Sequence, residues 1–314
     1  MKDTIYHIVY AIAYAYSLLP FRVLYFFSDA TFLLLYHLVR YRRHIVWNNL
    51  RTSFPEKSEK ELRKIERGFY HFLCDYFNES LKLLSISKEE MARRLEFRGL
   101  DKLEEYFAAG RSCAGILGHY CNWEWLSTFG LALKKSDNVA IGLIYQPLRN
   151  KTFDKLFVAL RSSTGGMCIP KNKILRYIVR CKHEGKQTWF GYIADQTPRV
   201  ANIHLWIDFL NHDTPVFTGA ERIMRSDNDV VFYLGLHRER RGKYVCAIEL
   251  ITDKPGELPE HEITRRFFAL LEKSIRSAPQ FYLWSHNRWK HTREEVAARE
   301  ARHRKRHDEQ SSDT

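Results

Sequence analysis

Apolar positions along this chain fall into two patterns, short continuous runs and longer stretches with helical spacing. Short apolar runs are typical of buried strands, and apolar residues at every third or fourth position are typical of helices. The first pattern predicts strands over residues 113–117, 139–145, 188–194, 204–209, 230–236 and 244–250. The second predicts helices over residues 58–84, 123–135, 152–162, 173–183, 219–226 and 260–277.

The order of these predicted elements indicates the fold class. From residue 113 onward strands and helices alternate, which favours an α/β fold with a mixed, largely parallel central sheet flanked by helices. The late strands follow one another with fewer helices between them, so an antiparallel portion is expected. Nothing between residues 45 and 290 has the composition of a linker, and 45% hydrophobic residues allow a sizeable core. One large domain is therefore predicted.

The first 43 residues differ from the rest. Residues 4–21 contain no Asp, Glu, Lys or Arg, and a second apolar run, residues 23–39, is interrupted by Asp29 and His37. Each run is slightly short or flawed for a bilayer span, which needs about 20 apolar residues. The pattern predicts membrane-associated helices that either span once or lie as an interfacial hairpin. Two amphipathic helices packed on the domain are the alternative.

Charge and cysteine content narrow the class of partner. Fifty basic and 37 acidic residues give a net charge of +13, which suits an anionic partner such as an acidic membrane surface or an acidic protein. No recognised nucleic-acid module is present, so nucleic acid is not predicted as a partner. The six cysteines form no C-x-x-C pair and are interpreted as reduced thiols facing the cytosol. No metal site or cofactor is predicted.

The candidate chemistry lies in one short segment, Gly118 to Glu124. His119 and Glu124 stand five positions apart, where the predicted strand 113–117 gives way to a helix. An imidazole is a natural general base near neutral pH, and a carboxylate on its other ring nitrogen would fix the tautomer. The alternative is a core histidine near a helix-start glutamate. The two side chains can meet only if the chain bends between them.

This segment resembles the H-x4-D/E motif of glycerolipid and lipid A acyltransferases. The ending Asn122-Trp123-Glu124 is similar to that of the late lipid A acyltransferases, the lauroyl/myristoyl acyltransferase family. Other matches follow in the same order over roughly residues 10 to 290. They are the segment 145–150, Arg161 with Gly165 and Gly166, the segment 194–198, Phe217-Thr218-Gly219, and the segment 284–290.

The resemblance implies an O-acyltransferase at the cytoplasmic face of the inner membrane. It would move a fatty acyl chain from an acyl carrier protein thioester to a hydroxyl of a lipid A precursor, without a cofactor. In that scheme His119 deprotonates the hydroxyl and Glu124 orients His119. The expected substrate-binding residues, which include candidate oxyanion donors, are Asn122, Gln146, Arg149, Arg161, Asp195 and Gln196.

One position departs from the family pattern. The family usually has an arginine where this chain has Gln146, and a glutamine cannot neutralise an anion as a guanidinium does. A lysophospholipid or lyso-aminolipid acceptor and an inactive lipid-binding homologue therefore remain alternatives. A third is nucleophilic catalysis by Cys121, as in a thioesterase. The predicted division is an anchor over 1–43, an acyltransferase domain over 44–290 and a basic, partly disordered tail over 291–314.

Overall fold

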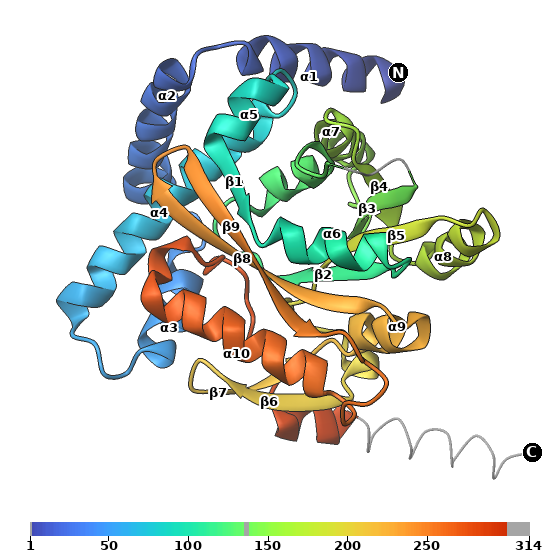
Figure 1. Cartoon of the computed structure of the whole chain (residues 1–314). Helices are drawn as coiled ribbons and strands as arrows, with labels where there is room; N and C mark the ends of the chain where they lie inside the picture. The colour runs from blue at the N-terminus through green and yellow to red at the C-terminus, as the bar shows by residue number, and fades with distance from the viewer. Residues whose placement is uncertain (1, 135–137, 300–314) are drawn as a thin grey trace, which may run out of the picture.

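A computed structural model describes residues 2–134 and 138–299 (Figure 1). Its centre is a seven-stranded sheet in the order β1-β9-β8-β2-β5-β3-β4. The strands are β1 (Leu95–Arg98), β2 (Cys113–Leu117), β3 (Val139–Tyr145), β4 (Met167–Pro170), β5 (Gln187–Ile193), β8 (Val230–Arg240) and β9 (Lys243–Thr252). A separate two-stranded sheet joins β6 (Leu205–Phe209) to β7 (His212–Val216).

Most neighbours in the large sheet run parallel. Only the β8–β9 pair is antiparallel, so β1 and β9 run against the other five strands. The predicted α/β fold with a mixed, largely parallel sheet is confirmed, and so is its antiparallel late portion. The carboxyl ends of β2, β3, β4 and β5 consequently lie at one edge of the sheet, the usual place for a ligand site in such folds.

Helices cover the sheet and connect its strands. Those that the apolar spacing predicts are present as α4 (Glu59–Lys82), α7 (Lys151–Ser162), α8 (Ile174–His183), α9 (Gly219–Asp227) and α10 (Glu262–Ser277). The prediction for 123–135 is corrected, because a 3₁₀ helix, η2 (Trp123–Leu131), occupies it. The spacing missed the short helices α3 (Arg43–Ser53), α5 (Lys88–Arg94) and α6 (Leu100–Ala108) and the strands β1, β4 and β7.

The N-terminal helices lie against the long helix α4. They are α1 (Lys2–Ser17) and α2 (Phe21–Leu33), continued by a π-helical segment, η1 (Leu34–Val39), and in Figure 1 they form one outer side of the molecule. α4 begins with a reciprocal capping box, in which Ser58 accepts from the Glu61 N–H and Glu61 accepts from the Ser58 N–H. The stretch Phe21–Val39 is the one described helix that is long and apolar enough to cross a membrane.

The N-terminal helices contact the rest of the molecule, so the predicted boundary at residue 43 between the anchor and the acyltransferase domain stays a prediction. The basic tail is helical over residues 293–299. The rest of the tail, residues 300–314, for which partial disorder is predicted, lies outside the described residues.

Candidate active site

The register of two central strands brings His119 to Asp195. In the parallel pair β2–β5, Leu117 lies opposite Ile193, and both chains leave the sheet at that point. Asp195 therefore follows β5 by the same two positions by which His119 follows β2. The Ala194 N–H donates to the Leu117 carbonyl at 3.1 Å, which continues the ladder one residue further. Two polar residues are thus fixed side by side at the carboxyl edge of the sheet.

The His119 imidazole is held from both ring nitrogens. Nδ1 lies 2.6 Å from Asp195 Oδ1, and the His119 backbone N–H donates to Asp195 Oδ2 at 3.0 Å. On the other side Gln196 Nε2 lies 3.1 Å from His119 Nε2. A carboxylate can only accept here, so the proton belongs on Nδ1, and Nε2 carries the basic lone pair, which accepts from the Gln196 amide.

Glu124 pairs with a different residue from the one expected. Arg161 donates to it in bidentate fashion, from Nε to Oε2 and from Nη2 to Oε1, both at 2.7 Å. The Tyr76 hydroxyl adds a third bond to Oε1 at 3.2 Å. The expected bond from Glu124 to His119 is therefore corrected, because Asp195 occupies Nδ1 and Arg161 takes both oxygens of the buried Glu124 carboxylate. A bidentate guanidinium–carboxylate pair fixes orientation as well as charge.

Trp123 lies between the two pairs. Its ring meets the His119 ring edge-on, with centroids 4.9 Å apart, and lies 4.2 Å from the Tyr76 ring. The His119–Asp195 pair and the Glu124–Arg161 pair are therefore neighbours across one buried indole. Tyr76 comes from α4, and nothing in the sequence pattern marked it as part of this region.

The chain bends sharply between His119 and Glu124, as the five-residue spacing requires. Cys121 adopts a left-handed conformation with φ of 52°, and Tyr120 forms an isolated antiparallel bridge with Tyr282. The Cys121 side chain is fully buried, and this burial raises the pKa of its thiol. A buried, protonated thiol is a poor nucleophile, which argues against the thioesterase alternative.

The other predicted site residues are placed differently. The Asn122 side chain is fully buried and donates to Glu79 on α4 at 2.9 Å, and this bond fixes the loop that follows β2. Gln146 and Arg149 are exposed on the loop after β3, where the Gln146 amide donates to the Pro147 carbonyl at 3.3 Å. In the described part of the chain, the side-chain partners of His119 are Asp195 and Gln196, and neither Gln146 nor Arg149 bonds to it, although both lie at the same edge of the sheet.

Comparison with known proteins shows the family of this chain. The family of bacterial lipid A biosynthesis acyltransferases matches residues 1–291. The chain belongs to this family. It is similar to the lipid A biosynthesis lauroyltransferase of Escherichia coli (strain K12), with 25% identity over 285 residues that cover 90% of each chain. It is also 20% identical over 249 residues to the lipid A biosynthesis acyltransferase of Haemophilus influenzae, covering 79% of this chain and 76% of that one.

Family membership confirms the resemblance found in the sequence and supports an acyltransferase that acts on lipid A. The contacts of Asp195 determine its charge. Burial alone would raise the pKa of Asp195, but the attraction of His119 and Arg288 and the bonds from His119 hold it below its ordinary value. Asp195 is therefore an anion at neutral pH. Among the described residues, no cluster of His, Cys, Asp and Glu is arranged to hold a metal ion.

A second histidine, His286, contacts the segment that follows Asp195. The Thr197 N–H donates to His286 Nε2 at 3.3 Å, and burial lowers the pKa of His286 to about 4. The folded state therefore favours neutral His286, whereas the unfolded chain takes up a proton near pH 6.5. Stability is full above pH 6.5 and falls as the pH drops toward about 4, by roughly 3 kcal/mol from this group.

We expect His286→Gln, which keeps an acceptor for Thr197, to lose part of this pH dependence. The measurement is thermal unfolding of both proteins in the same detergent from pH 4 to 8. The difference between them should change across pH 4–6.5 and stay constant above pH 7. Parallel curves over the whole range would show that His286 does not titrate in this window.

Proposed function

We propose that this protein transfers a fatty acyl chain from an acyl carrier protein thioester to a hydroxyl of a lipid A precursor, at the cytoplasmic face of the inner membrane. The observation that carries the proposal is the His119 imidazole, held by Asp195 on Nδ1 at the carboxyl edge of the sheet, in a chain of the lipid A acyltransferase family. The donor, the exact acceptor and the membrane are parts of this proposal.

The hydrogen bonds of His119 support the following acyl-transfer step. His119 Nε2 accepts the proton of the acceptor hydroxyl as its oxygen attacks the thioester carbonyl, and Asp195 stabilises the imidazolium that forms. The C–S bond then breaks, and the proton passes from Nε2 to the departing thiolate. Because Gln196 now bonds to Nε2, the acceptor hydroxyl must displace its amide. The displaced amide can then bond to the acceptor, which keeps Gln196 in the substrate-binding role expected of it.

Arg161 is the better oriented candidate for stabilising the oxyanion. It is bonded to the buried Glu124 carboxylate through two hydrogen bonds, so its guanidinium has one fixed orientation. Arg149 has no such support on its exposed loop. A preorganised donor lowers the barrier more than a mobile one, because it needs no reorganisation as charge develops.

The surface of the N-terminal helices supports contact with a membrane. Their inner side is bound to the domain by polar contacts, among them Tyr25 to Glu79 at 2.9 Å and Ser28 to Asp75 at 2.7 Å. Their outer side exposes large apolar residues that are each more than half accessible: Ile8, Ile12, Leu18, Phe26, Leu34 and Leu38. An apolar helical surface of this extent on a basic protein fits a position in the bilayer interface.

The acceptor is tested together with the catalytic residue. Membranes containing wild type or His119→Ala receive acyl carrier protein thioesters and either a lipid A precursor or a lysophospholipid, and mass spectrometry reports the added acyl group. We expect transfer to the lipid A precursor and a loss of about 10³-fold with His119→Ala, the size of a general-base contribution. His44→Ala, an exposed histidine on α3, is the control.

Three outcomes would contradict this proposal in different ways. Equal transfer by wild type and His119→Ala would remove His119 from the mechanism. Transfer only to the lysophospholipid would replace the acceptor. If lipid bound but no acyl group were transferred, the result would favour the inactive lipid-binding homologue, the alternative raised by Gln146.

A further inference from the structure

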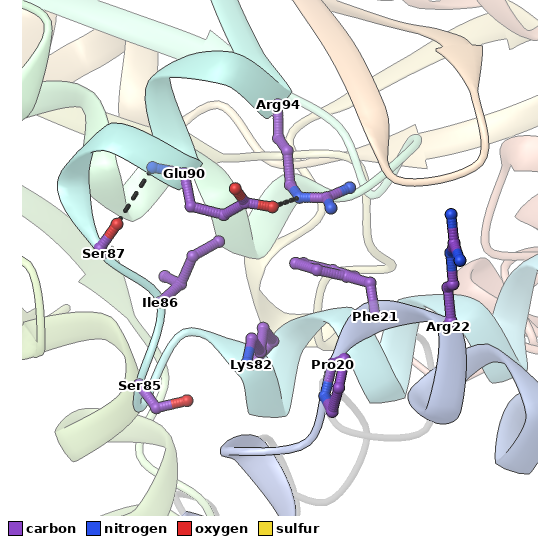
Figure 2. Close-up of a pocket in the computed structure, with 9 residues that line it drawn as sticks. All are labelled: Pro20, Phe21, Arg22, Lys82, Ser85, Ile86, Ser87, Glu90 and Arg94. Atoms are coloured by element: carbon purple, nitrogen blue, oxygen red, sulfur yellow. Dashed lines mark hydrogen bonds and ion pairs between the residues drawn. The ribbon is translucent and has the colours of Figure 1, made fainter.

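A cavity of about 450 Å³ lies at the elbow between α1 and α2, apart from the His119 site (Figure 2). Its walls come from three segments that are distant in sequence. Phe21 and Arg22 start α2, Lys82 ends α4, and Arg94 closes α5. Neither His119 nor Asp195 lines the cavity or is hydrogen-bonded to one of these four residues, so the cavity is a separate site.

Positive charge dominates this cavity. Arg22, Lys82 and Arg94 line it, and Glu90 is the one acidic residue among its lining residues. Glu90 is already bonded to two arginines, to Arg94 Nε at 2.6 Å and to Arg93 at 2.5 Å. The charge of Glu90 is therefore compensated within α5, and the cavity presents excess positive charge to whatever enters it.

The cations keep donors free for a ligand. Lys82 Nζ donates to the carbonyls of Ser17 and Leu19, at 2.7 and 3.0 Å, which leaves one of its three N–H bonds. Arg22 is exposed, and among the described residues none forms a hydrogen bond or ion pair with its guanidinium. Burial lowers the pKa of Lys82, and an anion bound beside it would offset that cost. In Figure 2 the side chains of Arg22, Lys82 and Arg94 stand around the Phe21 ring.

The position of the cavity indicates the ligand class. Leu18 and Val23, on either side of the elbow, are 59% and 36% exposed and belong to the apolar outer surface of α1 and α2. A lipid whose chains lie against that surface can reach the elbow with its headgroup. Basic residues at such a boundary attract the phosphates of anionic lipids, and arginine suits phosphate geometry.

We propose that this elbow cavity binds the phosphate of an anionic membrane lipid between Arg22, Lys82 and Arg94. The inference rests on the membrane association proposed above. The bound lipid holds the elbow in place and thereby fixes the depth and orientation of the N-terminal helices in the membrane interface.

The test uses the full chain and vesicle flotation. Vesicles contain phosphatidylcholine alone or with one fifth phosphatidylglycerol, and the variants are Arg22→Glu and, as the matched control, Arg265→Glu. Arg265 is an exposed arginine on α10, which lies far from α1 in Figure 1. We expect phosphatidylglycerol to strengthen vesicle binding of the wild type. Arg22→Glu should weaken binding to the phosphatidylglycerol vesicles by about tenfold or more. Arg265→Glu should lose less than about threefold.

The outcomes separate this inference from the proposed membrane contact. Wild type that floats with neither vesicle would refute membrane association itself. Wild type that binds both vesicles equally, or equal losses in the two variants, would refute the cavity while membrane association stands. Inorganic phosphate is the last probe: ³¹P line broadening by the detergent-solubilised wild type, absent in Arg22→Glu, would show a site for free phosphate and overturn the lipid assignment.

Discussion

Replacing Asp195 with asparagine is expected to lower the turnover number of acyl transfer by about 10³- to 10⁴-fold with little change in KM. Asp195 sets the proton on His119 Nδ1 from 2.6 Å and leaves Nε2 basic. An asparagine amide can donate to Nδ1 instead, which moves the proton to Nε2 and removes the base. It also removes the anion that stabilises the imidazolium.

The comparison variants make this result specific. Asp195→Asn keeps the side-chain volume, and thermal unfolding shows whether it folds. Gln196→Ala should reduce turnover much less, because Gln196 neither sets the proton on Nδ1 nor stabilises the imidazolium. Near-normal turnover of Asp195→Asn, with loss in Glu124→Gln, would restore Glu124 as the partner of His119.

The sequence pointed to His119 but not to Asp195 as its hydrogen-bond partner, and the reason lies in strand order. The H-x4-E spacing made Glu124 the nearest carboxylate in the chain, whereas Asp195 lies 76 positions away. The two meet because β2 and β5 are neighbours with Leu117 opposite Ile193. Spacing along a chain carries no information on which strands are adjacent. Had strand order been known, equal offsets from β2 and β5 would have predicted the pair.

The same limit applied to the N-terminal segment. Asp29 read as a flaw in an apolar run, yet in the structure it forms an ion pair with Arg241, at 2.6 Å from Nη2. Arg241 comes from the turn between β8 and β9, more than 200 positions later. Strong local patterns, such as the α4 periodicity with its Ser58 cap, were predictable. Short elements such as β1 and β4 were not, because four residues carry too little periodicity.

Arg161→Met is expected to have the largest effect on stability, about 3–5 kcal/mol, because it leaves the Glu124 carboxylate buried without its cation. Glu124 is only 3% exposed, and Tyr76 alone would still donate to it. In a chain of this size the loss corresponds to a fall in Tm of very roughly 5–10 °C. Thermal unfolding in detergent measures it. Arg266→Met, which breaks an exposed pair with Glu262 on α10, should cost less than about 1 kcal/mol.

The double variant separates stability from catalysis. Glu124→Gln combined with Arg161→Met removes both charges, so most of the lost stability should return, because no buried charge then lacks a partner. Acyl transfer should not return, since the oriented guanidinium proposed to stabilise the oxyanion is still missing. If the double variant regained activity together with stability, the Glu124–Arg161 pair would have only a structural role. If Arg161→Met unfolded no earlier than wild type, the pair would contribute nothing to the fold.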